Sequence, residues 1–206
     1  KVVKAYKMGT WDGRKHLFNK RSGAFPTGLL STVKRVCEEA GAAVEIVDHR
    51  MAPRPNKDGF ELHGVSMTGK YDYQMDACKA AVEKKQGIIK IATGGGKTGC
   101  AVAIAKYLGL PTLMIVPTRE LMHQTRKSFM KFLQIEDPSV IGIIGDGFWE
   151  PGSFVTIAIT DTLESRLNEE ECIEFLSNID VLFMDEAHRC GSETYFKAVM
   201  TCPAYY

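Results

Sequence analysis

After residue 69 the sequence alternates between short apolar runs and helical patterns, and few folds accommodate that order. The runs are β-branched and almost continuously apolar, which is typical of strands buried on both faces of a parallel sheet. Predicted strands span residues 87–92, 111–117, 140–145, 154–159 and 180–185, and predicted helices span residues 97–109, 118–133 and 168–179. This alternation predicts an α/β fold with an open sheet whose ligands bind at the carboxyl ends of the strands.

Composition places the chain among globular proteins, because 45% of its 206 residues are hydrophobic and 25% are charged. No apolar run approaches the roughly 18 residues that a membrane-spanning helix needs, and the first residues do not follow a signal-peptide pattern. We therefore expect a soluble protein without membrane contact, located in the cytoplasm or, if the source is viral, in the host cytoplasm. We also expect a monomer. Six cysteines without CxxC spacing favour reduced, buried thiols over disulfides or zinc.

Residues 1–68 differ from the rest and predict a small α+β accessory domain, followed by a second domain over residues 69–206. Its predicted elements are strands over residues 1–8, 14–20 and 43–49 and a helix over residues 27–41. In that helix Thr27 is the expected N-cap and Gly41 the expected C-terminal stop. Residues 51–59 contain prolines, an asparagine and a glycine, which indicates a loop near the boundary.

Positive charge is concentrated in the first domain. Residues 1–68 hold 12 Lys and Arg against 7 Asp and Glu, a balance of +5, whereas residues 69–206 hold 14 against 18, a balance of −4. This asymmetry favours a nucleic-acid-binding surface, although a solvated basic face would have the same composition. Trp11 could stack on a base or belong to a small core. The candidate phosphate contacts are Arg14, Lys15, Lys20, Arg21, Lys34 and Arg35.

The stretch "IIKIATGGGKTGCAVAIAKYLG" (residues 88–109) has the strand, glycine loop and helix of a phosphate-binding loop. Its end matches G-K-[ST], whereas Ile91 stands where the full pattern has its first glycine. Gly94, Gly95 and Gly96 allow backbone amides to approach phosphate oxygens at the N-terminus of the next helix. Lys97 is expected to reach the β and γ phosphates of ATP, and Thr98 to hold Mg²⁺. The alternative is a glycine-rich turn with an incidental lysine.

A second motif, "VLFMDEAHRCG", follows near residue 185, where an apolar strand ends in two carboxylates. Asp185 is expected to bind Mg²⁺ directly or through water, and Glu186 to orient and deprotonate the attacking water. An incidental acidic pair is the alternative, but a buried strand end is a poor place for one. The two motifs together predict a P-loop NTPase with a RecA-like parallel sheet.

These motifs resemble those of superfamily 2 helicases and translocases. Residues 185–188 spell the DEAH box, in which the resemblance implies that His188 couples the nucleotide site to the other motor domain. "ATGGGKT" resembles motif I, which adds Thr93 to the nucleotide-binding residues. "VPTRELMHQ" and "AITDTLESR" resemble the motifs that contact the nucleic-acid backbone, which implies that role for Thr118, Arg119 and Thr160. Otherwise Thr118 is a helix cap and the other two are surface positions.

Two further matches extend the resemblance over almost the whole chain. "YDYQMDA" (residues 71–77) resembles the adenine-reading element, which implies that Gln74 bonds the base beside Tyr71 or Tyr73. Alternatively, Gln74 is an ordinary glutamine at the start of a helix, and the two tyrosines belong to the core. "GTWDGRKHLFN" and "FPTGLLSTVKRVCEEAG" resemble the accessory domain of UvsW-type bacteriophage recombination and repair helicases. That likeness implies an ATP-dependent DNA helicase acting on branched or forked DNA, with an RNA–DNA hybrid as another possible substrate.

The sequence ends before the next superfamily 2 motif and lacks the second motor domain with its arginine fingers. We therefore expect the front half of a longer enzyme, one that binds Mg-ATP weakly and hydrolyses it poorly by itself. Alternatives are another superfamily 2 motor, such as a restriction translocase or an RNA helicase, and a non-hydrolysing DNA-binding module. A small-molecule P-loop kinase would leave the DEAH motif unexplained.

Overall fold

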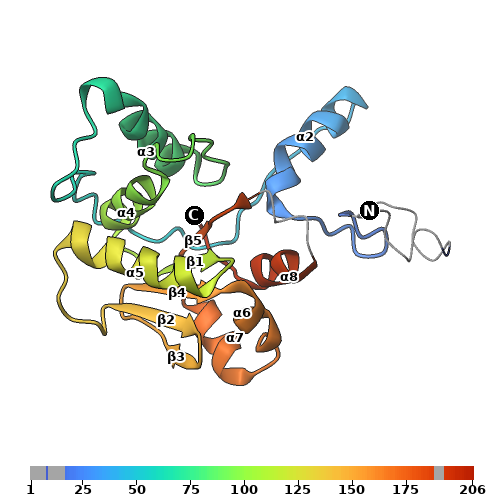
Figure 1. Ribbon diagram of the computed structural model, residues 1–206. Helices are drawn as coiled ribbons and strands as arrows, with labels where there is room; N and C mark the ends of the chain where they lie inside the picture. Colours follow the sequence, from blue (N-terminus) through green and yellow to red (C-terminus); the bar gives the residue numbers. More distant parts are fainter. Residues whose placement is uncertain (1–7, 9–16, 188–192) are drawn as a thin grey trace. The chain divides into compact units, whose positions relative to one another are not determined.

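A computed structural model describes residues 8, 17–187 and 193–206 of the chain. Contacts divide the chain into two compact units, residues 1–48 and residues 49–206. Among the described residues, the first unit holds helix α2 with the short turn before it, and the second holds the sheet and the remaining helices (Figure 1). We describe each unit by itself.

The first unit contains the predicted helix, as a 3-10 turn η1 (Thr27–Leu29) and helix α2 (Leu30–Glu39). Gly41 follows with a φ of 79°, the left-handed conformation expected after a helix end. The prediction that Thr27 caps the helix is wrong, because Pro26 and Leu29 occupy the two cap positions and neither side chain makes a cap bond. The predicted strand over residues 43–49 is also wrong, since these described residues form no strand.

The second unit is built on a sheet of five strands in the order β3-β2-β4-β1-β5. Strands β2, β4, β1 and β5 run parallel, and β3 is antiparallel to β2. The strands are β1 (Thr112–Val116), β2 (Ile141–Gly145), β3 (Phe148–Glu150), β4 (Val155–Ile159) and β5 (Val181–Met184). Four of the five predicted strands are therefore confirmed, together with the predominantly parallel α/β class.

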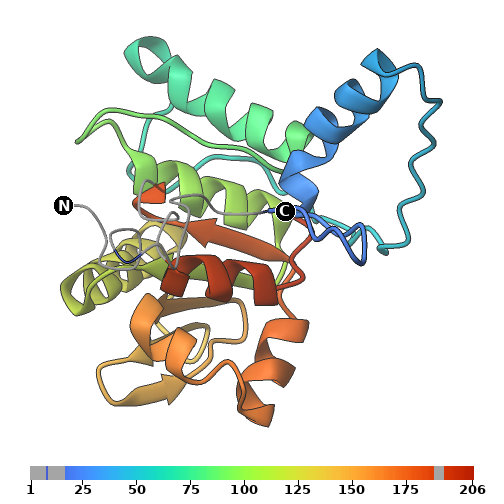
Figure 2. The ribbon, with the colours of Figure 1, turned by 90° about the vertical axis from the view of Figure 1, so that its right-hand side faces the viewer.

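Helices cover both faces of this sheet (Figures 1 and 2). Successive residues of β1 point to opposite sides, so that Met114 and Val116 join one apolar cluster while Leu113 and Ile115 join the other. The first cluster includes residues of α3 (Asp72–Lys84), α4 (Lys97–Leu108) and α5 (Arg119–Leu133). The second includes residues of α6 (Thr160–Ser165), α7 (Glu170–Ser177) and α8 (Glu193–Thr201). A short 3-10 turn, η2 (Gly69–Tyr71), precedes α3.

The predicted strand over residues 87–92 is absent, because these described residues form no sheet pairing. The side of β5 that faces away from β1 is bonded instead to the last residues of the chain. There the Leu182 amide donates to the Tyr206 carbonyl at 3.0 Å, and the Tyr205 amide donates to the Asp180 carbonyl at 3.0 Å. Ile88 is consequently 83% exposed. An apolar β-branched run thus lacks a strand partner here.

Asn56 and Phe60 belong to the second unit and pack on its helix α4. The Asn56 amide donates to the Leu108 carbonyl at 2.9 Å, and Phe60 stacks on Tyr107 with ring centroids 4.3 Å apart. Both contacts are made at the C-terminal end of α4. The second compact unit begins at His49, and the predicted domain boundary at residue 69 stays a prediction. In the part of the chain that is described, no helix has both the length and the apolarity that spanning a membrane requires.

The described cysteines behave as apolar core residues. Cys78, Cys100 and Cys172 are buried, and Cys37 and Cys202 are half-buried; all five are free thiols. Burial raises the pKa of Cys202 to about 11, so that its thiol is protonated at neutral pH. The described residues contain no disulfide among these five cysteines; the reduced state stays a prediction, and Cys190 lies outside the described residues.

Candidate nucleotide site and nucleic-acid edge

The glycine loop ends at the N-terminus of α4, with two of its glycines in left-handed conformations. Gly94 and Gly96 have φ values of 78° and 92°, which residues with a side chain rarely adopt. Gly96 is the N-cap of α4, and the exposed Lys97 is its first residue. The first amides of a helix have no partner within the helix and carry its positive dipole end. This terminus can therefore receive a phosphate.

Two side chains of α3 hold the glycine loop. The Gln74 amide nitrogen donates to the Gly95 carbonyl at 2.8 Å, and the Tyr73 hydroxyl donates to the same oxygen at 2.9 Å. Gln74 is 6% exposed, whereas Tyr73 and Tyr71 are about 40% exposed. The structure thus ties the predicted adenine-reading element to the phosphate loop. Adenine recognition by these residues stays a prediction, as does nucleotide contact by the exposed Thr93.

The acidic pair lies at the carboxyl end of β5. The Asp185 amide donates to the Ile115 carbonyl at 3.0 Å, which extends the pairing with β1. The Asp185 carboxylate also accepts the Glu186 amide at 3.0 Å. Glu186 is exposed and has a φ of 54°, a left-handed conformation that is uncommon for a glutamate and costs free energy. The structure therefore presents Glu186 in a strained turn after a rigid strand, and His188 lies outside the described residues.

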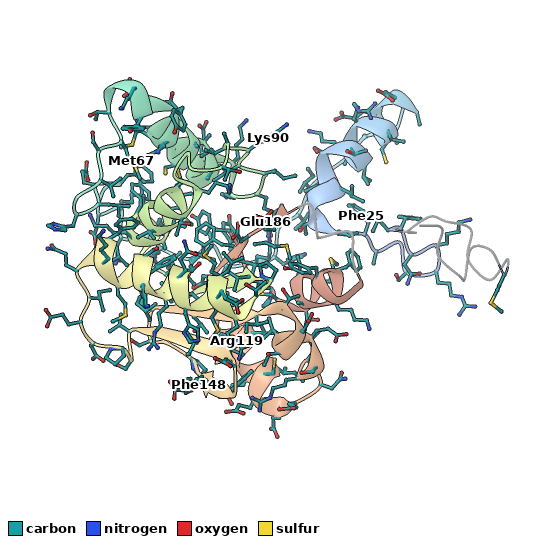
Figure 3. The ribbon with its side chains drawn as sticks, in the orientation of Figure 1. Phe25, Met67, Lys90, Arg119, Phe148 and Glu186 are labelled. Atoms are coloured by element: carbon teal, nitrogen blue, oxygen red, sulfur yellow. The ribbon has the colours of Figure 1, made fainter. Side chains whose placement is uncertain are left out.

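Both motifs lie on one side of the second unit. In Figure 2 the green segment that leads into α4 and the arrowhead of the orange-red β5 point to the same side, and Figure 3 labels Glu186 at that strand end. A lysine, a helix N-terminus, a threonine hydroxyl and two carboxylates suit a Mg-bound triphosphate. Mg²⁺ usually takes one or two protein oxygens and completes its shell with phosphates and water, so Thr98 and Asp185 fit as its ligands.

The predicted nucleic-acid contacts lie at the carboxyl ends of β1 and β4, the two strands that follow β5 in the order of the sheet. We call this part of the sheet, with Thr118, Arg119 and Thr160, the nucleic-acid edge. Thr118 follows β1 and caps α5, since its hydroxyl accepts the Leu121 amide at 3.3 Å. Arg119 is the first residue of that helix, with 60% of its side chain exposed. Thr160 follows β4, but it is 1% exposed and its hydroxyl donates to the Val116 carbonyl at 3.2 Å. The alternative that Thr160 is a surface position is therefore wrong, whereas Arg119 is exposed enough to reach a phosphate.

In the first unit the predicted basic contacts are partly neutralised. Arg35 lies 2.8 Å from the Glu39 carboxylate and Lys34 lies 3.7 Å from the Glu38 carboxylate, in both cases one helical turn apart. Such exposed pairs are weak, so both side chains can exchange partners. Lys20 and Arg21 are exposed, and Trp11, Arg14 and Lys15 lie outside the described residues.

Asp146 belongs to the same edge and was not among the predicted residues. It follows β2, and its carboxylate contacts Arg119 and His123 at 2.9 Å and 3.2 Å. Hydrogen bonds from His123 and Arg119 hold the pKa of Asp146 below its usual value. The Asp-Gly pair after a predicted strand was the available signal, because it marks a hairpin at a strand end.

The fold is that of a RecA-like domain, a mostly parallel five-stranded sheet with helices on both faces. The model of the ResIII family, described as "Type III restriction enzyme, res subunit", matches residues 68–206. Because this match spans more than half of the chain, the chain belongs to that family. This family assignment agrees with the predicted resemblance to superfamily 2 helicases and translocases.

Similarity to individual proteins agrees with this assignment. The chain is 35% identical over 140 residues to the DNA 3'-5' translocase XPB2 of Sulfurisphaera tokodaii, which covers 68% of this chain and 28% of that protein. The structure of the present chain is similar to that of the UvsW helicase of bacteriophage T4, with a TM-score of 0.69 and 20% identity. The match covers 96% of this chain and 73% of the UvsW chain. A second T4 UvsW structure gives a TM-score of 0.71 at 20% identity, covering 97% and 43%. The chain spans between 25% and 34% of the length of its curated relatives.

Proposed function

We propose that this chain is the first motor domain, with its accessory domain, of an ATP-dependent DNA helicase or translocase that remodels branched DNA in recombination and repair. The observation that carries the proposal is the common location of the glycine loop and the Asp185-Glu186 pair at one side of a RecA-like unit (Figure 2). The structural likeness to the UvsW helicase of bacteriophage T4 extends over 96% of the chain and supports the fold part of the proposal. The branched-DNA part is carried by the resemblance of the first 68 residues to the accessory domain of UvsW-type helicases.

The proposed chemistry follows from the groups at the site. Lys97 and the first amides of α4 bind the phosphates of ATP and balance their charge. Thr98 and Asp185 hold Mg²⁺, which would neutralise the charge that develops on the transferred phosphoryl group. Glu186 orients the attacking water and accepts its proton. In the strained turn at Glu186, the backbone amide of this residue donates to the Asp185 carboxylate.

The proposal includes a low rate for these 206 residues alone. The family resemblance implies that arginines of a second motor domain complete the ATP site, and such arginines are worth roughly 10³-fold or more in rate. The chain matches only about a third or less of its curated relatives, which supports a further domain in the complete protein. We therefore expect weak Mg-ATP binding and slow hydrolysis from the chain by itself.

Phosphate release by the complete protein tests this function. The assay compares single-stranded DNA, duplex DNA, forked DNA, an RNA–DNA hybrid and RNA, and uses Glu186→Gln as the matched inactive variant. We expect the strongest stimulation by forked DNA, and a loss of about 10²-fold or more in rate for Glu186→Gln because the general base is removed. Equal stimulation by plain duplex would exclude the branched-DNA assignment, and normal turnover by the variant would exclude Glu186 as the base.

A further inference from the structure

Asp146 has no part in the chemistry proposed above, yet it contacts the arginine of the nucleic-acid edge. One carboxylate oxygen accepts from Arg119 Nη1 at 2.9 Å, and the other lies 3.2 Å from His123 Nε2. Arg119 and His123 are four residues apart on α5, so their side chains share one face of the helix. A single carboxylate thus joins two side chains of α5 to the end of β2.

The backbone fixes the position of this carboxylate. Strand β2 ends at Gly145 and β3 begins at Phe148, which leaves Asp146 and Gly147 as a two-residue hairpin loop. Their φ values of 54° and 84° are both positive, as in the type I′ turn for which Asp-Gly is a preferred sequence. Figure 3 labels Arg119 and the hairpin residue Phe148 in the same region of the unit. The hairpin therefore holds Asp146 in place beside α5.

Exposure differs between the two partners. The Arg119 side chain is 60% exposed and that of Asp146 is 28% exposed. A second carboxylate, that of Glu120, lies 4.0 Å from Arg119 Nε, beyond hydrogen-bond distance. Arg119 consequently faces solvent while one of its donors is occupied by a carboxylate of fixed position. The Asp146 carboxylate therefore lies beside Arg119 at a position where an anionic ligand could bind instead.

We propose that, in the nucleic-acid-free chain, the Asp146 carboxylate occupies the place beside the Arg119 guanidinium at which a phosphate would bind. When nucleic acid binds, one of its backbone phosphates displaces this carboxylate. The inference rests on the proposed function, since it takes Arg119 to be a phosphate contact. Asp146 then has two effects: it keeps the guanidinium at the edge of the sheet, and it lowers the affinity for nucleic acid.

The exchange is physically reasonable. An exposed ion pair contributes little to stability, and Asp146 uses only Nη1 of the guanidinium. A phosphate can accept two parallel bonds from an arginine, which gives it a geometric advantage over this contact. Because the carboxylate adds negative charge where a phosphate must approach, its removal should strengthen binding in a salt-dependent way.

Fluorescence anisotropy of a labelled single strand and of a labelled forked duplex, titrated with the chain between ~50 and ~200 mM salt, tests the proposal. Asp146→Asn removes the charge and keeps the turn, because Asn-Gly also favours type I′ geometry. We expect about threefold or more tighter binding at the lowest salt, and a slope of log K against log salt that is steeper by about 0.7 to 0.9. Arg119→Ala should abolish that gain, which a double-mutant cycle measures.

Asp137→Asn is the matched control. Asp137 precedes β2 at the opposite end of the strand, and its carboxylate accepts from the Ser139 amide at 2.9 Å. This variant loses the same charge and should bind nucleic acid like the unaltered chain. An equal gain from Asp137→Asn would overturn the inference, and so would a gain from Asp146→Asn that persists with Arg119→Ala.

The remaining outcomes separate this inference from the proposed function. Nucleic-acid-stimulated ATP hydrolysis by the complete protein without tighter binding by Asp146→Asn would overturn only the inference. Tighter, Arg119-dependent binding without any ATP hydrolysis would support the inference and contradict the motor function. Absence of binding by both the unaltered chain and Asp146→Asn would overturn the inference.

Discussion

Gly96 adopts a backbone conformation at the phosphate loop that other residues rarely tolerate. Its φ is 92°, and an added Cβ would overlap the side-chain amide of Gln74. We expect Gly96→Ala to abolish binding of a fluorescent ATP analogue and to lower the free energy of unfolding by about 1 to 2 kcal/mol. Gly99→Ala is the control, because among the described residues no atom beyond its chain neighbours and the backbone of its own helix lies within 4 Å of an added Cβ there. Nucleotide binding by Gly96→Ala equal to that of the control would contradict the account.

Side-chain contacts between distant residues were the part of the site that the sequence could not supply. Asp146 is 27 positions from Arg119 along the chain, and their contact depends on how α5 and β2 lie against each other. Similarly, the hydroxyl of Thr160 donates to a carbonyl of a neighbouring strand end, so the motif alone could not show that it is buried. The motifs predicted which residues gather, because parallel strands end at a common edge.

At the scale of elements, the N-terminus of α5 holds both a helix cap, which stabilises the fold, and a predicted nucleic-acid contact. Thr118 caps this helix, and Arg119 is its first residue. We expect Thr118→Ala to lower the free energy of unfolding by about 1 kcal/mol in urea titrations, because the Leu121 amide loses its acceptor. Thr118→Ser keeps a hydroxyl cap and should lose less. Equal stability of all three chains would show that the cap contributes nothing.

Apolar runs predicted strands well only where a neighbouring strand exists. The runs around β1, β2, β4 and β5 lie between two helix layers, and all four form the parallel sheet. The runs at 43–49 and 87–92 have similar composition but form no strand. β-Propensity describes how a residue fits a paired, half-buried surface, so it cannot show whether a partner strand is present.

At the scale of the whole second unit, the parallel sheet sets the order of its sites. From β5 through β1 and β4 to β2, the strand ends carry the acidic pair, Thr118 with Arg119, Thr160 and finally Asp146. The acidic pair of the proposed nucleotide site thus lies at one end of this series of strand ends, and the exposed Arg119 lies at the end of the next strand. The two functions share β1, since Asp185 bonds to this strand and Thr118 follows it.

Binding of a fluorescent Mg-ATP analogue by the unaltered chain and by Lys97→Ala tests the central proposal, the ATP site, most directly. Lys106→Ala is the control, because Lys106 lies at the other end of α4 and bonds the Glu61 carbonyl at 2.8 Å. We predict that Lys97→Ala weakens binding by about tenfold or more, since it removes a charge-assisted phosphate contact, while Lys106→Ala binds like the unaltered chain. Equal affinity of the unaltered chain and Lys97→Ala would contradict an ATP site at the glycine loop.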